Sequence, residues 1–162
     1  MPLDITFDGA DEVTPGLDLL KGYGNALVRE KIVAAASRKL VILVGPERVE
    51  EKLVTALGQR GKLPIEVVPF ALPLCVSRLA EMKYPAEQVQ RPGGGGPFVS
   101  DNGNPILHAH VKPIADPAAL ERKLLDIPGV VGTGLFLGMA DVVIIEHAGG
   151  VVKVLERRNI SP

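Results

Sequence analysis

The most constraining feature of this sequence is the segment "KLVILVG", Lys39 to Gly45, in which aliphatic residues run without an alternating polar position. A strand with one solvent-facing side alternates apolar and polar residues, whereas a strand covered on both faces is apolar throughout. The segment therefore predicts a buried strand of a parallel sheet.

Helical patterns lie on both sides of this strand. The first runs from about Ala26 to Ala36, with Asn25 before it as a candidate N-cap. The second, "PERVEEKLVTALGQRG", starts with Pro46 and ends at Gly58 and Gly61. A short strand at 3–7 precedes both helices, which gives the order βαβα of an α/β unit. The apolar residues expected to face the core are Val28, Ile32 and Ala35 on the first helix, and Val49, Leu53 and Leu57 on the second.

From about Ile65 to Phe136 the pattern changes to βαββαβ, which is the ferredoxin-like order. Its second helix has Asp116 as its expected N-cap and Pro117 at its first position. The other expected elements are a strand at 65–70, a helix at 71–82, a hairpin at 97–111 that turns at "DNGN", and a strand at 129–136.

Residues 140–157 predict two further strands, joined by a turn near Gly149 and Gly150. Their apolar run "VVII" favours a return to the first sheet. The predicted fold class is therefore α/β: a partial Rossmann-like parallel sheet domain at 1–63 and 137–162, with an inserted ferredoxin-like α+β domain at 64–136.

The α/β part has only two βα units before the insertion, whereas doubly wound sheets usually carry about five or six strands. Two explanations stay open at this point. A front piece of the domain is missing from the chain, or a partner chain completes the sheet.

Composition excludes several classes of function. The net charge is -1 and aromatic residues make up 4% of the chain, so neither a basic surface nor a stacking platform for nucleic acid is expected. The single cysteine, Cys75, gives no disulfide framework and suits a reducing compartment. No apolar run is long enough to span a bilayer and no signal peptide is visible, so we expect a cytoplasmic protein without membrane contact.

Asp8 and Asp11 follow directly after the first predicted strand, in "DGADEV". Ligands of open α/β sheets bind at this carboxyl edge, so both carboxylates are candidate site residues. The alternative is an ordinary turn, in which Asp and Gly are common for conformational reasons.

Lys21, with the glycines of "GYG" after it, precedes the first predicted helix. Such a loop can bring backbone amides and a helix N-terminus to an anion, or it can simply form the turn before Asn25. Glu30 shares a helix face with Ala26, Val33 and Ala34, where lost hydration would raise its pKa toward that of a general base. The alternative is an exposed Glu30 paired with a neighbouring Arg or Lys.

Three other features favour structural explanations. His108 and His110 alternate on a predicted strand, and His147 is the only other histidine, so a metal site is not expected. Cys75 lies among aliphatic residues and is expected in the core. The run "GGGG" at 93–96 is expected to be a flexible loop tip.

Taken together, "DGADEV", "KGYGNALVREKIV", "LPIEVVPFA", "GPFVSDNGNPIL" and "IPGVVGTGLF" resemble type A ribose-5-phosphate isomerase. The segments occur in that family's order and cover nearly the whole chain. The resemblance implies an α/β domain interrupted by a ferredoxin-like one. It also implies interconversion of ribose 5-phosphate and ribulose 5-phosphate through an enediolate, without a metal or organic cofactor, in a homodimer or homotetramer.

The resemblance also implies roles for residues at matching positions. Glu30 falls on the family's catalytic base, and Asp8 and Asp11 match carboxylates that contact the sugar and assist ring opening. Lys21 matches the lysine at the reacting end of the substrate. The remaining implied contacts with substrate are Gly9, Ala10, Gly22, Tyr23, Gly24 and Arg48, the last of which stands where the family has a lysine.

This sequence departs from the family pattern in two places. "GYGN" replaces an all-glycine run, so Tyr23 either crowds the substrate or points outward, and Asn25 is expected to cap the helix. The family also carries an N-terminal segment with a Gly-Thr-Gly-Ser-Thr-type phosphate loop, which we expect this chain to lack. The alternative function is therefore a non-catalytic sugar-phosphate binder or oligomerisation module derived from the family.

Overall fold

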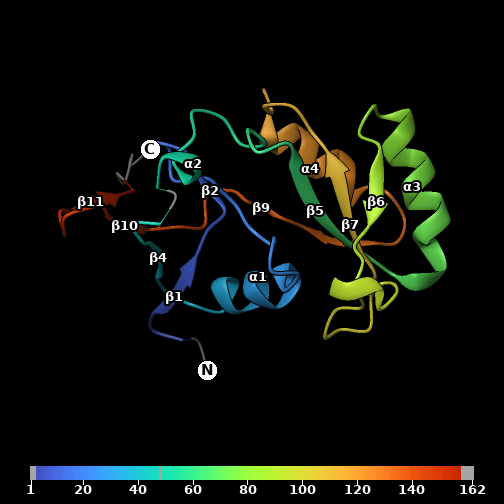
Figure 1. Ribbon diagram of the computed structural model, residues 1–162, viewed down its shortest axis with the longest axis horizontal. Helices are drawn as coiled ribbons and strands as arrows, with labels where there is room; N and C mark the ends of the chain where they lie inside the picture. Colours follow the sequence, from blue (N-terminus) through green and yellow to red (C-terminus); the bar gives the residue numbers. More distant parts are fainter. Residues whose placement is uncertain (1–2, 48, 158–162) are drawn as a thin grey trace.

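A four-stranded sheet contains the apolar segment at 39–45 (Figure 1). The computed structural model describes residues 3–47 and 49–157. The strands are β1 (Thr6–Gly9), β4 (Leu40–Val44), β10 (Val142–Glu146) and β11 (Val152–Glu156), in that spatial order. β1, β4 and β10 are parallel, and β11 pairs with β10 in the antiparallel sense. The predicted parallel strand and the return of "VVII" to it are thus confirmed.

Only one face of β4 is covered along its full length in the described structure. Ile42 is fully buried in a cluster with Phe136 and Val143, as expected for a core strand. Leu43 points to the other face and is 47% exposed, so the prediction of burial on both faces is wrong at this position. The prediction of parallel pairing is nevertheless confirmed, because β4 pairs in parallel with both β1 and β10.

A second sheet has the spatial order β6-β7-β5-β8, with every neighbouring pair antiparallel. Its strands are β5 (Lys62–Val67), β6 (Ala86–Gln88), β7 (Ile106–His110) and β8 (Val130–Thr133). Together with α3 (Leu72–Glu81) and α4 (Pro117–Leu125), they give the βαββαβ order of a ferredoxin-like unit. The predicted fold class is confirmed, while the domain boundaries at 63/64 and 136/137 stay a prediction.

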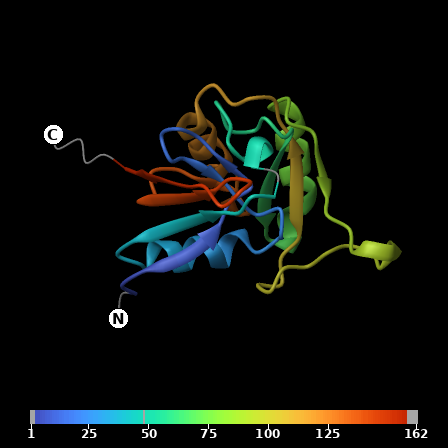
Figure 2. The same cartoon turned by 60° about the vertical axis from the view of Figure 1, so that its left-hand side comes forward.

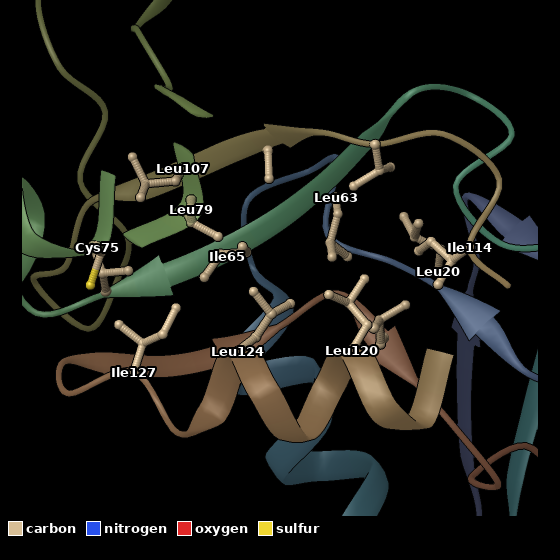
Figure 3. Packing of buried hydrophobic residues seen from close by; sticks show 14 of the residues in the cluster. Leu20, Leu63, Ile65, Cys75, Leu79, Leu107, Ile114, Leu120, Leu124 and Ile127 are labelled. Atoms are coloured by element: carbon tan, nitrogen blue, oxygen red, sulfur yellow. The ribbon is translucent and has the colours of Figure 1, made fainter. Parts of the chain in front are cut away.

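The core of this unit lies between its sheet and its helices. Figure 3 shows Leu120 and Leu124 of α4 directed at Leu63 and Ile65 of β5. Asp116 caps α4, because its Oδ1 accepts a hydrogen bond from the N–H of Ala119 at 2.9 Å, and Pro117 occupies the first turn, as predicted. Buried Cys75 packs in the same cluster, which confirms its assignment to the core.

A small third sheet connects the two units. It consists of β2 (Glu12–Val13), β3 (Leu19–Leu20) and β9 (Leu135–Phe136), which were not predicted as a sheet. The helix α1 (Leu27–Ala35) lies between the two larger sheets in Figure 1 and contacts β1, β5 and β8. The residues before and inside α1 are therefore held against both units.

Several element predictions are wrong in detail, including the strand expected at 129–136, which divides into β8 and β9 of different sheets. The expected helix at 46–61 shrinks to α2 (Val49–Lys52), because Leu53 forms a bridge with Val13 and the N–H of Val54 donates to the carbonyl of Val13. The first arm of the 97–111 hairpin makes only isolated bridges, and β6 takes its place in the sheet. The first strand lies at Thr6–Gly9 rather than at 3–7.

The expected core face of α1 is also wrong. Ile32 is 61% exposed and Ala35 is exposed, whereas Leu27 and Ala34 are buried. The side chains that α1 buries are thus Leu27 in its first turn and Ala34 in its last, rather than the predicted stripe. Short 3-10 turns complete the fold at Pro69–Ala71 and Pro92–Gly94, and the second stands out from the body in Figure 2, as expected for the "GGGG" loop tip. No helix of the described residues is long and apolar enough to cross a membrane.

Candidate active site

The carboxyl end of β1 forms one wall of the candidate site. Asp8 lies within the strand, and its Oδ1 accepts a hydrogen bond from the N–H of Gly9 at 2.7 Å. The chain then turns, and the N–H of Asp11 donates to the carbonyl of Leu20 on β3. This turn places both aspartates at the sheet edge, where the sequence predicted a ligand site.

Lys21 lies at the centre of the site. It follows β3, and the chain is only 3% exposed at this residue. Its Nζ lies 2.9 Å from Oδ2 of Asp8 and 3.3 Å from Oε2 of Glu30, and it donates a hydrogen bond to the carbonyl of Gly9. The ring of Phe136 lies 5.4 Å from the same nitrogen. The side-chain nitrogen of Lys21 therefore contacts two carboxylates, a carbonyl and an aromatic face.

Glu30 reaches the site from the first turn of α1. Burial raises the pKa of its carboxyl group above the ordinary 4.5, while the ammonium of Lys21 acts in the opposite direction and the charge of Asp8 adds to the rise. The alternative of a solvent-facing ion pair does not hold, because the cation that Glu30 meets is the buried Lys21.

Asp11 is the second carboxylate with a raised pKa in this region. Its Oδ2 accepts a hydrogen bond from the backbone N–H of Tyr23 at 2.9 Å. Burial raises the pKa of this carboxyl group, although the Tyr23 hydrogen bond and the charges of Lys21, Arg60 and Lys62 each lower it. A carboxyl group with a raised pKa is more easily able to hold and release a proton near neutrality.

These groups surround one pocket of about 220 Å³, lined by residues 8–11, Lys21, Gly22, Gly24 and Glu30. The structure thus brings together nearly all of the predicted site residues. Tyr23 directs its side chain elsewhere, with its hydroxyl donating to the carbonyl of Lys62 at 3.2 Å. Arg48, the last predicted contact, lies outside the described residues.

The loop that carries Lys21 is fixed by a close approach at Gly22. This residue has φ +101°, and a Cβ built there would lie 2.9 Å from Cβ of Leu27. Asn25 has φ +67° and makes no cap of α1, because Ala26 is the N-cap residue and no side chain caps it. The predicted Asn25 cap is therefore wrong: the residue takes the left-handed turn conformation, in which Oδ1 is buried without a hydrogen-bond partner.

Gly22→Ala is expected to lower the free energy of unfolding by roughly 1–3 kcal/mol, because both the positive φ and the contact with Leu27 disfavour a side chain. Urea unfolding followed by circular dichroism measures the change. Gly24→Ala is the matched control, because a Cβ at Gly24 meets nothing within 4 Å. Equal stability of the two variants would contradict the prediction.

Glu12 is a buried residue of this region that the sequence did not single out. Its Oε2 accepts from the N–H of Gly58 at 2.6 Å, and its Oε1 accepts from the N–H of Arg60 at 2.7 Å. Glu12 therefore connects the 58–60 loop to the segment that carries Asp8 and Asp11. The only feature of the sequence that could have pointed to this role is its place next to Asp11. Among the described residues, no group of three His, Cys, Asp or Glu side chains is arranged to hold a metal ion.

Known proteins are similar to this chain in sequence and in fold. The family model for ribose 5-phosphate isomerase A (phosphoriboisomerase A) matches residues 1–150, which include every residue of the pocket. The chain belongs to the ribose 5-phosphate isomerase A family.

Individual members of the ribose 5-phosphate isomerase A family are similar over almost the whole chain. The ribose-5-phosphate isomerase A of Roseiflexus castenholzii is 48% identical over 153 residues, covering 94% of this chain and 63% of the relative. The protein of the same name from Thermomicrobium roseum is 49% identical over 161 residues, covering 98% and 65%. A solved D-ribose-5-phosphate isomerase in complex with phospho-erythronic acid has a TM-score of 0.88 at 41% identity, covering 96% of this chain and 66% of that one. The chain thus spans slightly less than two thirds of the length of these family members.

Proposed function

We propose that this chain catalyses the interconversion of D-ribose 5-phosphate and D-ribulose 5-phosphate as an aldose-ketose isomerase. The observation that carries the proposal is the contact of Glu30, a carboxylate with a raised pKa, with the buried ammonium of Lys21 in one pocket. Membership of the ribose 5-phosphate isomerase A family supports the substrate.

The reaction moves a proton between C1 and C2 of the sugar through an enediolate. Glu30 acts as the base that takes the proton from one carbon and delivers it to the other. Lys21 stabilises the negative charge that develops on the adjacent oxygen, because its ammonium is already in place and is shielded from water. The reaction class needs no metal or organic cofactor.

The sugar ring must open before the proton can move. Asp11 has a raised pKa and Asp8 contacts Lys21 directly, so these carboxyl groups serve as the acid and base at the ring oxygen and anomeric hydroxyl. Among the described residues that line the pocket, Lys21 is the only basic side chain, whereas Asp8, Asp11 and Glu30 are acidic. Such a pocket favours the uncharged sugar end over the phosphate dianion, which orients the substrate.

The test is an assay of ribulose 5-phosphate formation in two arms. One arm contains this chain alone, and the other adds the portion of the Thermomicrobium roseum relative that this chain does not cover, because the chain covers 65% of that relative. Ketose formed in proportion to this chain, above the rate of the added portion alone, supports the proposal. Absence of ketose in both arms would overturn it.

Calorimetric titration with phospho-erythronic acid, the ligand present in a solved relative, separates an enzyme from the alternative of a non-catalytic binder. Binding without ketose formation in either arm would identify a sugar-phosphate binder. If the chain neither binds phospho-erythronic acid nor forms ketose, the remaining candidate function is the oligomerisation module. A homodimer or homotetramer stays a prediction from the family resemblance, and a cytoplasmic location stays a prediction from the composition and the apolar runs of the sequence.

The activity is expected to fall on the acid side of neutrality. Glu30 must be ionised to accept a proton, and burial holds its pKa above the ordinary 4.5. A profile of kcat/KM from pH 4 to 8 is therefore expected to fall with an apparent pKa above 4.5 while circular dichroism shows a folded protein. A profile that stays flat down to pH 4 would contradict this role for Glu30.

A further inference from the structure

The ring of Tyr23 lies beside two cations at the start of the ferredoxin-like unit. Its centroid is 4.9 Å from the guanidinium carbon of Arg60 and 4.0 Å from Nζ of Lys62. The hydroxyl donates to the carbonyl of Lys62, and the ring packs against the main hydrophobic cluster. Cation–π contacts of this kind, together with partial burial, hold an aromatic side chain in one orientation.

The backbone of the same residue holds a wall of the pocket. The N–H of Tyr23 donates to Oδ2 of Asp11, and Nη1 of Arg60 donates to the carbonyl of Asp11 at 3.3 Å. The ring and the amide of Tyr23 thus connect the 60–62 segment to a carboxylate that borders the pocket.

The neighbours of Tyr23 cannot provide this anchorage. Gly22 and Gly24 on either side have no side chains, and the Oδ1 of Asn25 makes no hydrogen bond with the described residues. Glycine backbones lose more conformational freedom on ordering than any others. Lys21 anchors the start of the loop, so the glycine-flanked part after it depends on the packed side chain of Tyr23.

We propose that Tyr23 is a positioning residue, whose clamped ring fixes the 21–24 loop so that its own amide holds the carboxylate of Asp11 at the pocket. It acts through Asp11 and does not touch the reacting atoms. The catalytic part of the inference rests on the proposed isomerase function, and the positioning part does not. The chain uses a packed tyrosine at a position where the family pattern has glycine.

The experiment compares Tyr23→Ala and Tyr23→Phe with the unchanged chain, with Tyr84→Ala as the matched control. Tyr84 packs against the same hydrophobic cluster but does not line the pocket. Tyr23 has a negative φ, so alanine fits its backbone conformation. Phenylalanine keeps the ring between the two cations and loses only the hydroxyl contact with Lys62.

The first readout is the pKa of the Asp11 carboxyl group, followed by ¹³C NMR during an acid titration. The charged groups that act on Asp11 are Lys21, Arg60 and Lys62, and Asp11 in turn acts on Glu30. Loss of the Tyr23 amide hydrogen bond is expected to move the Asp11 pKa upward in Tyr23→Ala and to leave it in place in Tyr23→Phe and Tyr84→Ala. An unchanged Asp11 pKa in Tyr23→Ala would overturn the inference, whether or not the chain is an isomerase.

The second readout is kinetic, in whichever arm of the assay is active. Tyr23→Ala is expected to lower kcat/KM about tenfold, and Tyr23→Phe is expected to retain at least about half of the activity. Tyr84→Ala is expected to lower stability without changing kcat/KM or the Asp11 pKa. A pKa shift in Tyr23→Ala without any kinetic change would overturn the catalytic part alone, and inactivity of the unchanged chain in both arms would count against the isomerase function instead.

Discussion

Glu30→Gln is expected to lower kcat by about 10³-fold, because the amide cannot accept the proton that moves between C1 and C2. The glutamine keeps the size of the side chain and its place in the first turn of α1. The measurement is the rate of ribulose 5-phosphate formation in the active arm of the assay. Glu50→Gln, which changes an exposed carboxylate in the first turn of α2, is the matched control and is expected to retain full activity.

Glu30→Gln is expected to leave the folded chain as stable as the unchanged chain, or more stable, at pH 8. The pKa of Glu30 is raised, so the folded chain holds its proton more tightly than the unfolded chain does. The stability that this group contributes is complete below pH 4.5 and is lost as the pH rises through the raised pKa. A neutral glutamine avoids that loss. Thermal unfolding at pH 8 that shows a clearly less stable variant would contradict the sign of this effect.

Lys21→Met is expected to reduce kcat/KM by about 10²–10³-fold, because no cation then faces the developing oxyanion. It is also expected to lower the free energy of unfolding by roughly 2–4 kcal/mol at pH 7, since Asp8 and Glu30 lose their shared partner. Steady-state kinetics and urea unfolding measure the two effects, with exposed Lys39→Met as the control.

The loss of stability in Lys21→Met is expected to shrink at acid pH. Lys21 lowers the pKa of Glu30, so its removal raises that pKa further, and protonation relieves the unpaired carboxylates. Urea unfolding at pH 4.5 and pH 7 therefore gives a smaller difference from the unchanged chain at the lower pH. An equal or larger difference at pH 4.5 would show that the two carboxylates are not coupled through Lys21.

Local patterns predicted much of the fold because they carry their own physical signal. The aliphatic run gave β4, the second apolar run gave β10, and the sequence "DP" gave the cap and first turn of α4. Predictions failed where tertiary contacts decide. The bridge of Leu53 to Val13 ends α2 early, and the turn at Asn25 overrides its tendency to cap.

The candidate site was predictable in membership but not in geometry. The residues alone left Glu30, Asp8 and Asp11 as candidates beside ordinary structural alternatives, and the family resemblance decided in their favour. The geometry of the site, in which the buried ammonium of Lys21 joins Asp8 to Glu30, depends on the pairing of β3 with β9. No local sequence pattern predicts this pairing. The direction of the Tyr23 ring, away from the pocket, depends in the same way on Arg60 and Lys62, which are distant in sequence.

The most direct test of the central claim is the fate of the proton on C2 of ribose 5-phosphate, followed by ¹H NMR in D₂O. With this chain in the active arm, the H2 resonance is expected to decay as the ketose appears, at a rate proportional to the concentration of the chain. With Glu30→Gln, the decay is expected to be about 10³-fold slower. An H2 resonance that persists in both arms, or one that decays equally fast with Glu30→Gln, would contradict the assignment of Glu30 as the base.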